Sequence, residues 1–123
     1  MALTLEEITR EIKQFCSERD WDKFLKPKDL ILALVSEIGE LAECFRWLSE
    51  EELDKILKNH EKKKKIEEEV ADILYWLIII SDKLGIDMLK VLENKMEINK
   101  KRFPIEESKG VHTNPIDGSK GRR

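Results

Sequence analysis

Two pairs of acidic residues have the spacing that places side chains on one face of a helix. Glu37 and Glu40 stand three residues apart, and Glu69 and Asp72 repeat that separation. Residues three apart in a helix project from the same side. Asp72 also lies within an apolar stretch, VADILYWL, residues 70–77. A carboxylate in such surroundings is costly unless a cation pairs with it.

If the two helices face each other, the four carboxylates converge and repel one another. Their repulsion would force protons onto some of them unless a divalent ion lies between them. A site made only of oxygen ligands selects a hard ion, so we expect Mg²⁺, with Mn²⁺ as a substitute. Mg²⁺ binds substrate phosphates, and such a centre can activate water. The pattern predicts a hydrolytic metal centre whose ligands and catalytic residues are Glu37, Glu40, Glu69 and Asp72.

The alternative interpretation is a non-catalytic helical interaction module, on which these acids are merely solvent-exposed charges. Asp72 favours the enzyme, because a docking helix needs no acid inside an apolar stretch. A di-iron carboxylate bundle would add a His three residues after a Glu. Neither of the 2 His residues follows a Glu at that distance. Cys16 and Cys44 lie far apart with no CxxC spacing, which predicts free thiols and no zinc or redox site.

The elements that must position the acids are helices. The 123 residues fit one domain, and a hydrophobic share of 41% with a charged share of 40% is typical of helices with one buried and one charged face. The net charge of -3 argues against a nucleic-acid polymer as partner. The longest apolar run, residues 73–80, is too short to cross a bilayer, so we expect no membrane association and a cytoplasmic location.

Capping signals and apolar periodicity predict where the helices begin and end. The first should cover residues 4–19, and the second should begin at Pro27 and run toward Trp47. Ser49 followed by Glu52 is a capping box that starts another helix.

The remaining helices follow from similar signals. We expect a break near Asn59 and His60, a helix end at Gly85, and a final helix that Asp87 caps and Pro104 stops.

Together these signals predict an all-α protein, a four-to-five-helix bundle. The domain should span residues 1–104, followed by a polar, extended or flexible tail over residues 105–123. The run over residues 73–80 is apolar nearly all round, which predicts that this face meets another subunit.

The acidic motifs resemble the hallmark of the MazG-like all-α nucleoside triphosphate pyrophosphohydrolase family, EExxE followed after a gap by ExxD. Here the segments read SEIGE, with Ser36 in place of the first Glu, and EVAD. The resemblance covers roughly residues 5–104 and is closest to the deoxycytidine triphosphate pyrophosphatase branch. Its matching segments are ERDWDKF (residues 18–24), LALVSEIGELAECFRW (32–47), EEVADILYWL (68–77) and KMEINKKRFP (95–104).

The resemblance implies a Mg²⁺-dependent enzyme that cleaves a triphosphate between its α and β phosphates. The products would be a nucleoside monophosphate and pyrophosphate, the substrate dCTP or a modified dCTP, and the role nucleotide-pool housecleaning. The four acids would hold the metal, and one Glu would help water attack the α phosphorus. Which Glu does so stays open.

The resemblance also implies a substrate site and an oligomer. Aromatic residues would stack on the base, and residues of the last helix would face phosphates or sugar; in the deoxycytidine branch the position of Trp76 is usually Tyr. Family members assemble so that helices of different subunits complete the active site, so we expect a homotetramer, with a dimer as alternative. The substrate-binding candidates are Trp21, Phe24, Trp47, Trp76, Lys95, Asn99 and Arg102.

Overall fold

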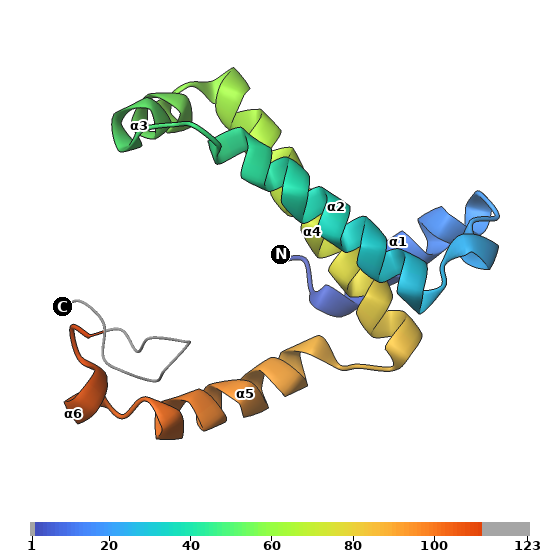
Figure 1. The fold of residues 1–123 in the computed structure, drawn as a ribbon. Coiled ribbons are helices and arrows are strands. Elements are labelled where there is room, and N and C mark those ends of the chain that lie inside the picture. The colour runs from blue at the N-terminus through green and yellow to red at the C-terminus, as the bar shows by residue number, and fades with distance from the viewer. Residues whose placement is uncertain (1, 112–123) are drawn as a thin grey trace. The chain divides into compact units, whose positions relative to one another are not determined.

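The computed structural model describes residues 2–111, and all regular structure in that range is helical. The elements are α1 (Leu5–Glu18), a short 3-10 helix η1 (Asp22–Phe24), α2 (Pro27–Phe45), α3 (Glu50–Lys58), α4 (His60–Leu84), α5 (Met88–Arg102) and α6 (Ile105–Ser108) (Figure 1). The predicted all-α fold is confirmed.

The polar caps form as the sequence predicts. Thr4 accepts a hydrogen bond from the Glu7 amide at the start of α1. Ser49 and Glu52 form a capping box at the start of α3. Asn59 ends α3 and, through its side chain, accepts the Lys62 amide at the start of α4. The predicted break between these helices is therefore confirmed. Asn59 stabilises it, because its side chain accepts one of the backbone amides that the start of a helix leaves unpaired.

Glycine and aspartate separate the last two long helices. Gly85 follows α4 with a φ of 67°, in the left-handed region that glycine adopts without a Cβ penalty. Asp87 then caps α5 by accepting the Lys90 amide. Both boundaries agree with the sequence prediction.

The end of α2 differs from the sequence prediction. The helix was expected to run toward Trp47, but it ends at Phe45, and Trp47 has a φ of 68°. A non-glycine residue in this left-handed conformation cannot continue a right-handed helix, so the chain turns here toward α3.

Helices α2 and α4 lie side by side along much of their length, with α1 and α3 packed against α4 (Figure 1). The buried core consists of Cys16, Leu30, Ile79 and Ile80, so it joins α1, the start of α2 and the end of α4. Partly buried residues pack around it, namely Ile12, Leu25, Leu34, Tyr75 and Trp76. The core fixes α2 against α4, and the acidic pairs lie on these same two helices.

The apolar run in α4 divides between core and surface. The end of the run, residues 78–80, is buried within this chain and so is not available to another subunit. Leu74 and Leu77 stay exposed. Other exposed apolar residues lie on α2 and α4, namely Ile31, Leu32, Val35 and Ile38 on α2 and Val70 on α4.

The chain separates into two compact units, Met1–Ile86 and Asp87–Arg123. In the second unit, α6 follows Pro104, where the sequence analysis expects extended or flexible chain. Residues 112–123 of that predicted tail lie outside the described residues. The division of the chain at residue 104 remains a prediction. Within the described range, no helix combines the length and the apolar character needed to cross a membrane.

Candidate metal centre

Helices α2 and α4 bring three of the four predicted carboxylates together. Glu37 and Glu40 project from adjacent turns of α2, and Glu69 projects from α4. One oxygen of each lies within 4.8 Å of the others. Three carboxylate oxygens at this separation form an all-oxygen donor set suited to a hard divalent cation.

Burial makes this cluster different from ordinary surface acids. Glu69 is only 2% exposed, and the Oε2 atoms of Glu37 and Glu69 are buried without a hydrogen-bond partner in the described residues. A buried carboxylate oxygen without a partner costs free energy, and native proteins rarely leave one in that state. The two oxygens therefore fit the coordination of a cation, and the donor set fits Mg²⁺.

Asp72 lies one helical turn beyond Glu69, on the same side of α4. It is exposed and does not belong to the group of three oxygens. Its negative charge is nevertheless one of the causes that raise the pKa of Glu37. The structure thus places Asp72 at the margin of the cluster.

The crowding of acids changes the protonation of Glu37. Burial raises its pKa from 4.5 to about 7, with further contributions from the neighbouring Glu69 carboxylate and from the charge of Glu40. The protonated form of Glu37 is favoured because burial and the neighbouring negative charges both penalise its carboxylate.

This shift predicts how pH affects the stability of the metal-free protein. Since the pKa of Glu37 rises from 4.5 to about 7 on folding, the folded state binds more protons than the unfolded state between these values. Stability therefore falls as pH rises from about 5 to about 7. We expect the melting temperature in chelator to fall over this interval, measured by circular dichroism, and to fall less in Glu37→Gln.

Glu69 affects stability in the opposite direction and at lower pH. Its pKa is lowered in the folded state, so its contribution to stability is lost as the pH falls into the acid range. The interval above about pH 5 therefore isolates Glu37. Parallel pH profiles of wild type and Glu37→Gln would contradict the assignment.

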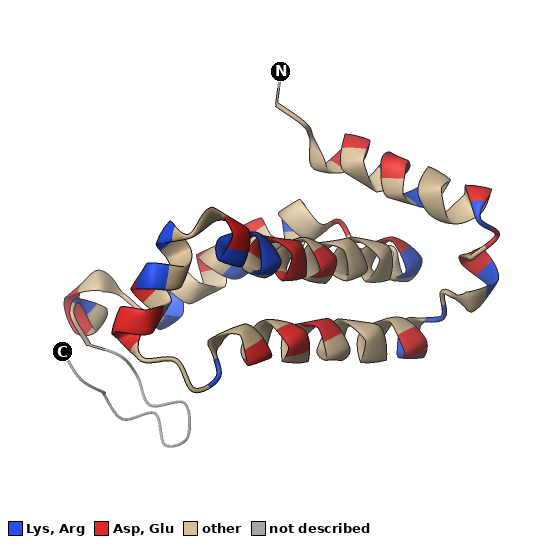
Figure 2. Cartoon of the chain, turned by 90° about the horizontal axis from the view of Figure 1, so that it is seen from above, with Lys and Arg blue, Asp and Glu red and all other residues tan. Residues whose placement is uncertain are grey.

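Lys65 is a member of this cluster that the sequence analysis missed. Its Nζ lies 2.7 Å from Glu69 Oε1, and this hydrogen bond holds the pKa of Glu69 below its usual range. Figure 2 shows the lysines over residues 62–65 near the start of α4, followed by the acids over residues 67–69. After Asp72 comes an uncharged stretch, residues 73–81. The sequence does contain a signal for this pair, because Lys65 precedes Glu69 by four residues. Other lysines of the run precede an acid by the same distance, so the spacing alone does not single out Lys65.

Two hollows lie beside the core and share Trp21 and Trp76 in their walls. The first, which we call the aromatic hollow, is lined by Phe15, Trp21, Ala71, Asp72, Tyr75 and Trp76. The second is lined by Trp21, Phe24, Leu25, Asp29, Leu30, Ala33 and Trp76. Three of the predicted base-binding residues are thus brought together, and Asp72 connects the aromatic hollow to the acids.

Edge-to-face contacts hold the aromatic side chains in place. The ring centroids of Phe15 and Trp21 are 5.5 Å apart, and those of Tyr75 and Trp76 are 5.0 Å apart. The Tyr75 hydroxyl lies 3.5 Å from Cys16 Sγ, and burial raises the pKa of this phenol, so it stays neutral. Phe15 and Tyr75 were not predicted as site residues, because their helical spacing is equally typical of core positions.

The other predicted substrate residues lie elsewhere. Trp47 is 86% exposed, beyond the end of α2, with the Arg46 guanidinium 5.0 Å from its ring centroid. It does not line either hollow. Lys95, Asn99 and Arg102 belong to α5 in the second unit, where Lys95 and Asn99 lie one turn apart on one face.

Comparisons with known proteins agree on one family. A family model described as MazG-like matches residues 32–115. The dCTP pyrophosphatase 1 of Rattus norvegicus is 37% identical over 107 residues, which cover 87% of this chain and 63% of that protein. The protein of the same name from Bos taurus is 38% identical over the same shares. The chain therefore matches less than two thirds of the length of these relatives.

A solved structure supports the same grouping. The crystal structure of a pyrophosphatase from Archaeoglobus fulgidus superposes with a TM-score of 0.77 at 31% sequence identity. The match covers 85% of this chain and 95% of that one.

Proposed function

Because the chain belongs to the MazG-like family, we propose that it is a Mg²⁺-dependent pyrophosphohydrolase that converts a nucleoside triphosphate into the monophosphate and pyrophosphate. The observation that carries this proposal is the trio Glu37, Glu40 and Glu69, with two buried carboxylate oxygens that have no partner in the described residues. A helical interaction module does not require a glutamate that is only 2% exposed in a cluster of acids, because burying its charge costs free energy.

The positions of the four carboxylates suggest a role for each in holding the cation. Glu37, Glu40 and Glu69 would hold the cation, and Asp72 would complete the set from the next turn of α4. Mg²⁺ bound there would polarise the phosphate oxygens and lower the pKa of a coordinated water. The same carboxylates provide the acceptors that orient an attacking water at the α phosphorus.

The aromatic hollow is our proposed site for the base. Trp21 and Trp76 offer ring faces for stacking, which tolerates different bases. Because Asp72 lines the same hollow, a base stacked there would have its phosphates close to the proposed cation. We propose dCTP or a modified dCTP as substrate, since two of the relatives are named dCTP pyrophosphatase. Phe24 would extend the pocket through the second hollow.

The charged end of α5 supplies candidates for binding the rest of the nucleotide. Lys95 and Asn99 share one face of α5, and Arg102 follows in its last turn. We propose that Lys95 and Asn99 contact phosphate or sugar and that Arg102 assists them.

We further propose that the protein is a homotetramer, with a dimer as the alternative. Leu32, Val35 and Val70 are each more than half exposed, on two helices that also carry the site. Apolar surface of this extent on neighbouring helices is typical of an interface. In such an assembly Trp47 would complete the site of a neighbouring subunit. The mass in solution, measured by light scattering, distinguishes the two assemblies.

Product analysis tests the enzymatic proposal. We expect the purified protein with Mg²⁺ to convert at least one triphosphate of a nucleotide panel to monophosphate and pyrophosphate, with dCTP among the best substrates. Asp72→Ala and Glu40→Ala should lose most of this activity, because each removes a negative ligand. Hydrolysis of no triphosphate, or full activity in both variants, would contradict the proposal.

A further inference from the structure

Lys65 forms an ion pair that differs from the other pairs on the helices of this chain. Its Nζ lies 2.7 Å from Glu69 Oε1, while the Lys65 side chain is 62% exposed and the Glu69 side chain only 2%. A Lys placed four residues before a Glu is the less favourable order for a helix, and exposed pairs contribute little. Helix stability alone therefore gives only a weak reason for this contact. Its partner is the most buried acid of the metal centre.

The contact divides the two oxygens of Glu69 between two roles. Oε1 accepts the hydrogen bond from Lys65, whereas Oε2 is buried and has no partner in the described residues. Glu37 Oε2 is in the same state. A carboxylate held by one oxygen can no longer rotate freely, so its second oxygen keeps a fixed direction toward the other acids.

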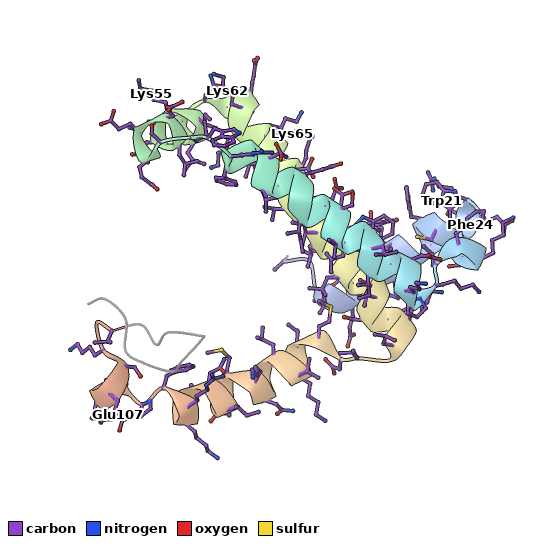
Figure 3. All side chains as sticks on the ribbon, viewed as in Figure 1. Trp21, Phe24, Lys55, Lys62, Lys65 and Glu107 are labelled. Carbon is purple, nitrogen blue, oxygen red and sulfur yellow. The ribbon has the colours of Figure 1, made fainter. Side chains whose placement is uncertain are left out.

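The position of Lys65 permits this role without blocking the centre. It lies on α4 toward the α3 end of the α2–α4 pair, whereas Trp21 and Phe24 lie near the other end (Figure 3). Its side chain is 62% exposed and comes from the turn of α4 before Glu69, whereas Asp72, which lines the aromatic hollow, comes from the turn after it.

We propose that Lys65 is a positioning residue of the metal centre, which holds Glu69 through Oε1 so that Oε2 is presented to the divalent cation. This inference rests on the proposed metal site. Ligating carboxylates are commonly held by a further hydrogen bond, and loss of such a partner weakens metal affinity by about 10- to 100-fold.

Metal affinity of the purified protein tests this role without relying on activity. We expect Lys65→Met to weaken Mn²⁺ binding by about 10- to 100-fold, measured by the electron paramagnetic resonance signal of the free ion. Lys65→Arg keeps a charged donor and should bind within a few-fold of wild type. Lys64→Met is the matched control, because Lys64 is an exposed neighbour for which no ion pair is found in the described residues, and it should bind like wild type.

The outcomes separate this inference from the proposed function. If wild type binds Mn²⁺ and a folded Lys65→Met binds it equally well or more tightly, Lys65 does not position Glu69, and the metal site stands without it. Tighter binding would mean that the ammonium competes with the cation. If wild type binds no Mn²⁺, the metal site itself is wrong and this inference falls with it. Circular dichroism verifies that each variant is folded.

Discussion

Glu69→Gln should lower kcat/KM for the proposed triphosphate cleavage by at least about 100-fold, since it removes a proposed metal ligand. Loss of a group that only supports a ligand costs about 10- to 100-fold. Glutamine keeps the shape of the side chain, which is 2% exposed, but it removes the negative charge. It also leaves Lys65 without its acceptor at 2.7 Å. The loss should therefore come from metal binding, and raising the Mg²⁺ concentration should recover part of the activity.

Glu67→Gln is the control for this experiment. Glu67 is an exposed acid two residues earlier on α4, and two residues correspond to about 200° of helix rotation, so it points away from the cluster. Steady-state rates across a Mg²⁺ titration should be unchanged in this variant. If Glu69→Gln and Glu67→Gln are equally active, Glu69 has no role in the reaction.

Trp21→Ala should raise KM for the preferred nucleotide, because Trp21 lines both hollows in which the base is proposed to stack. A stacked base contributes about 1–3 kcal/mol, which corresponds to roughly 5- to 150-fold in affinity. The ring is 42% exposed and contacts Phe15 edge to face, so its removal should affect the fold less than the loss of a core residue would. Initial rates over a range of nucleotide concentrations give KM and kcat separately.

Trp21→Phe is the matched variant, since it keeps an aromatic face in the same place. It should retain most of the affinity that Trp21→Ala loses. If both variants show wild-type KM, the base binds elsewhere, and the exposed Trp47 of a neighbouring subunit becomes the next residue to test.

Local signals explain why most of the helices and the acidic cluster were predictable from the sequence. The caps at Ser49 and Asn59 depend on side chains within three residues of the helix start, so the sequence contains the whole interaction. The spacing of Glu37 and Glu40 likewise fixes their common face. Only the pairing of α2 with α4 needed a tertiary assumption, and the apolar residues of both helices made it reasonable.

Features that depend on tertiary contacts were not predictable in the same way. Lys65 is one of several lysines in a row, and only the burial of Glu69 distinguishes its ion pair from the others. Asp72 was predicted as a metal ligand within an apolar stretch, yet its side chain is exposed and lines the aromatic hollow. The turn at Trp47 depends on a left-handed backbone conformation that no local residue preference demands.

Cleavage in water enriched in heavy oxygen tests most directly the central claim, that this carboxylate cluster directs water to the α phosphorus of a nucleoside triphosphate. The account predicts that mass spectrometry of the products finds the heavy oxygen in the nucleoside monophosphate and none in the pyrophosphate. Heavy oxygen in pyrophosphate or in orthophosphate would contradict it, because water would then have attacked a different phosphorus.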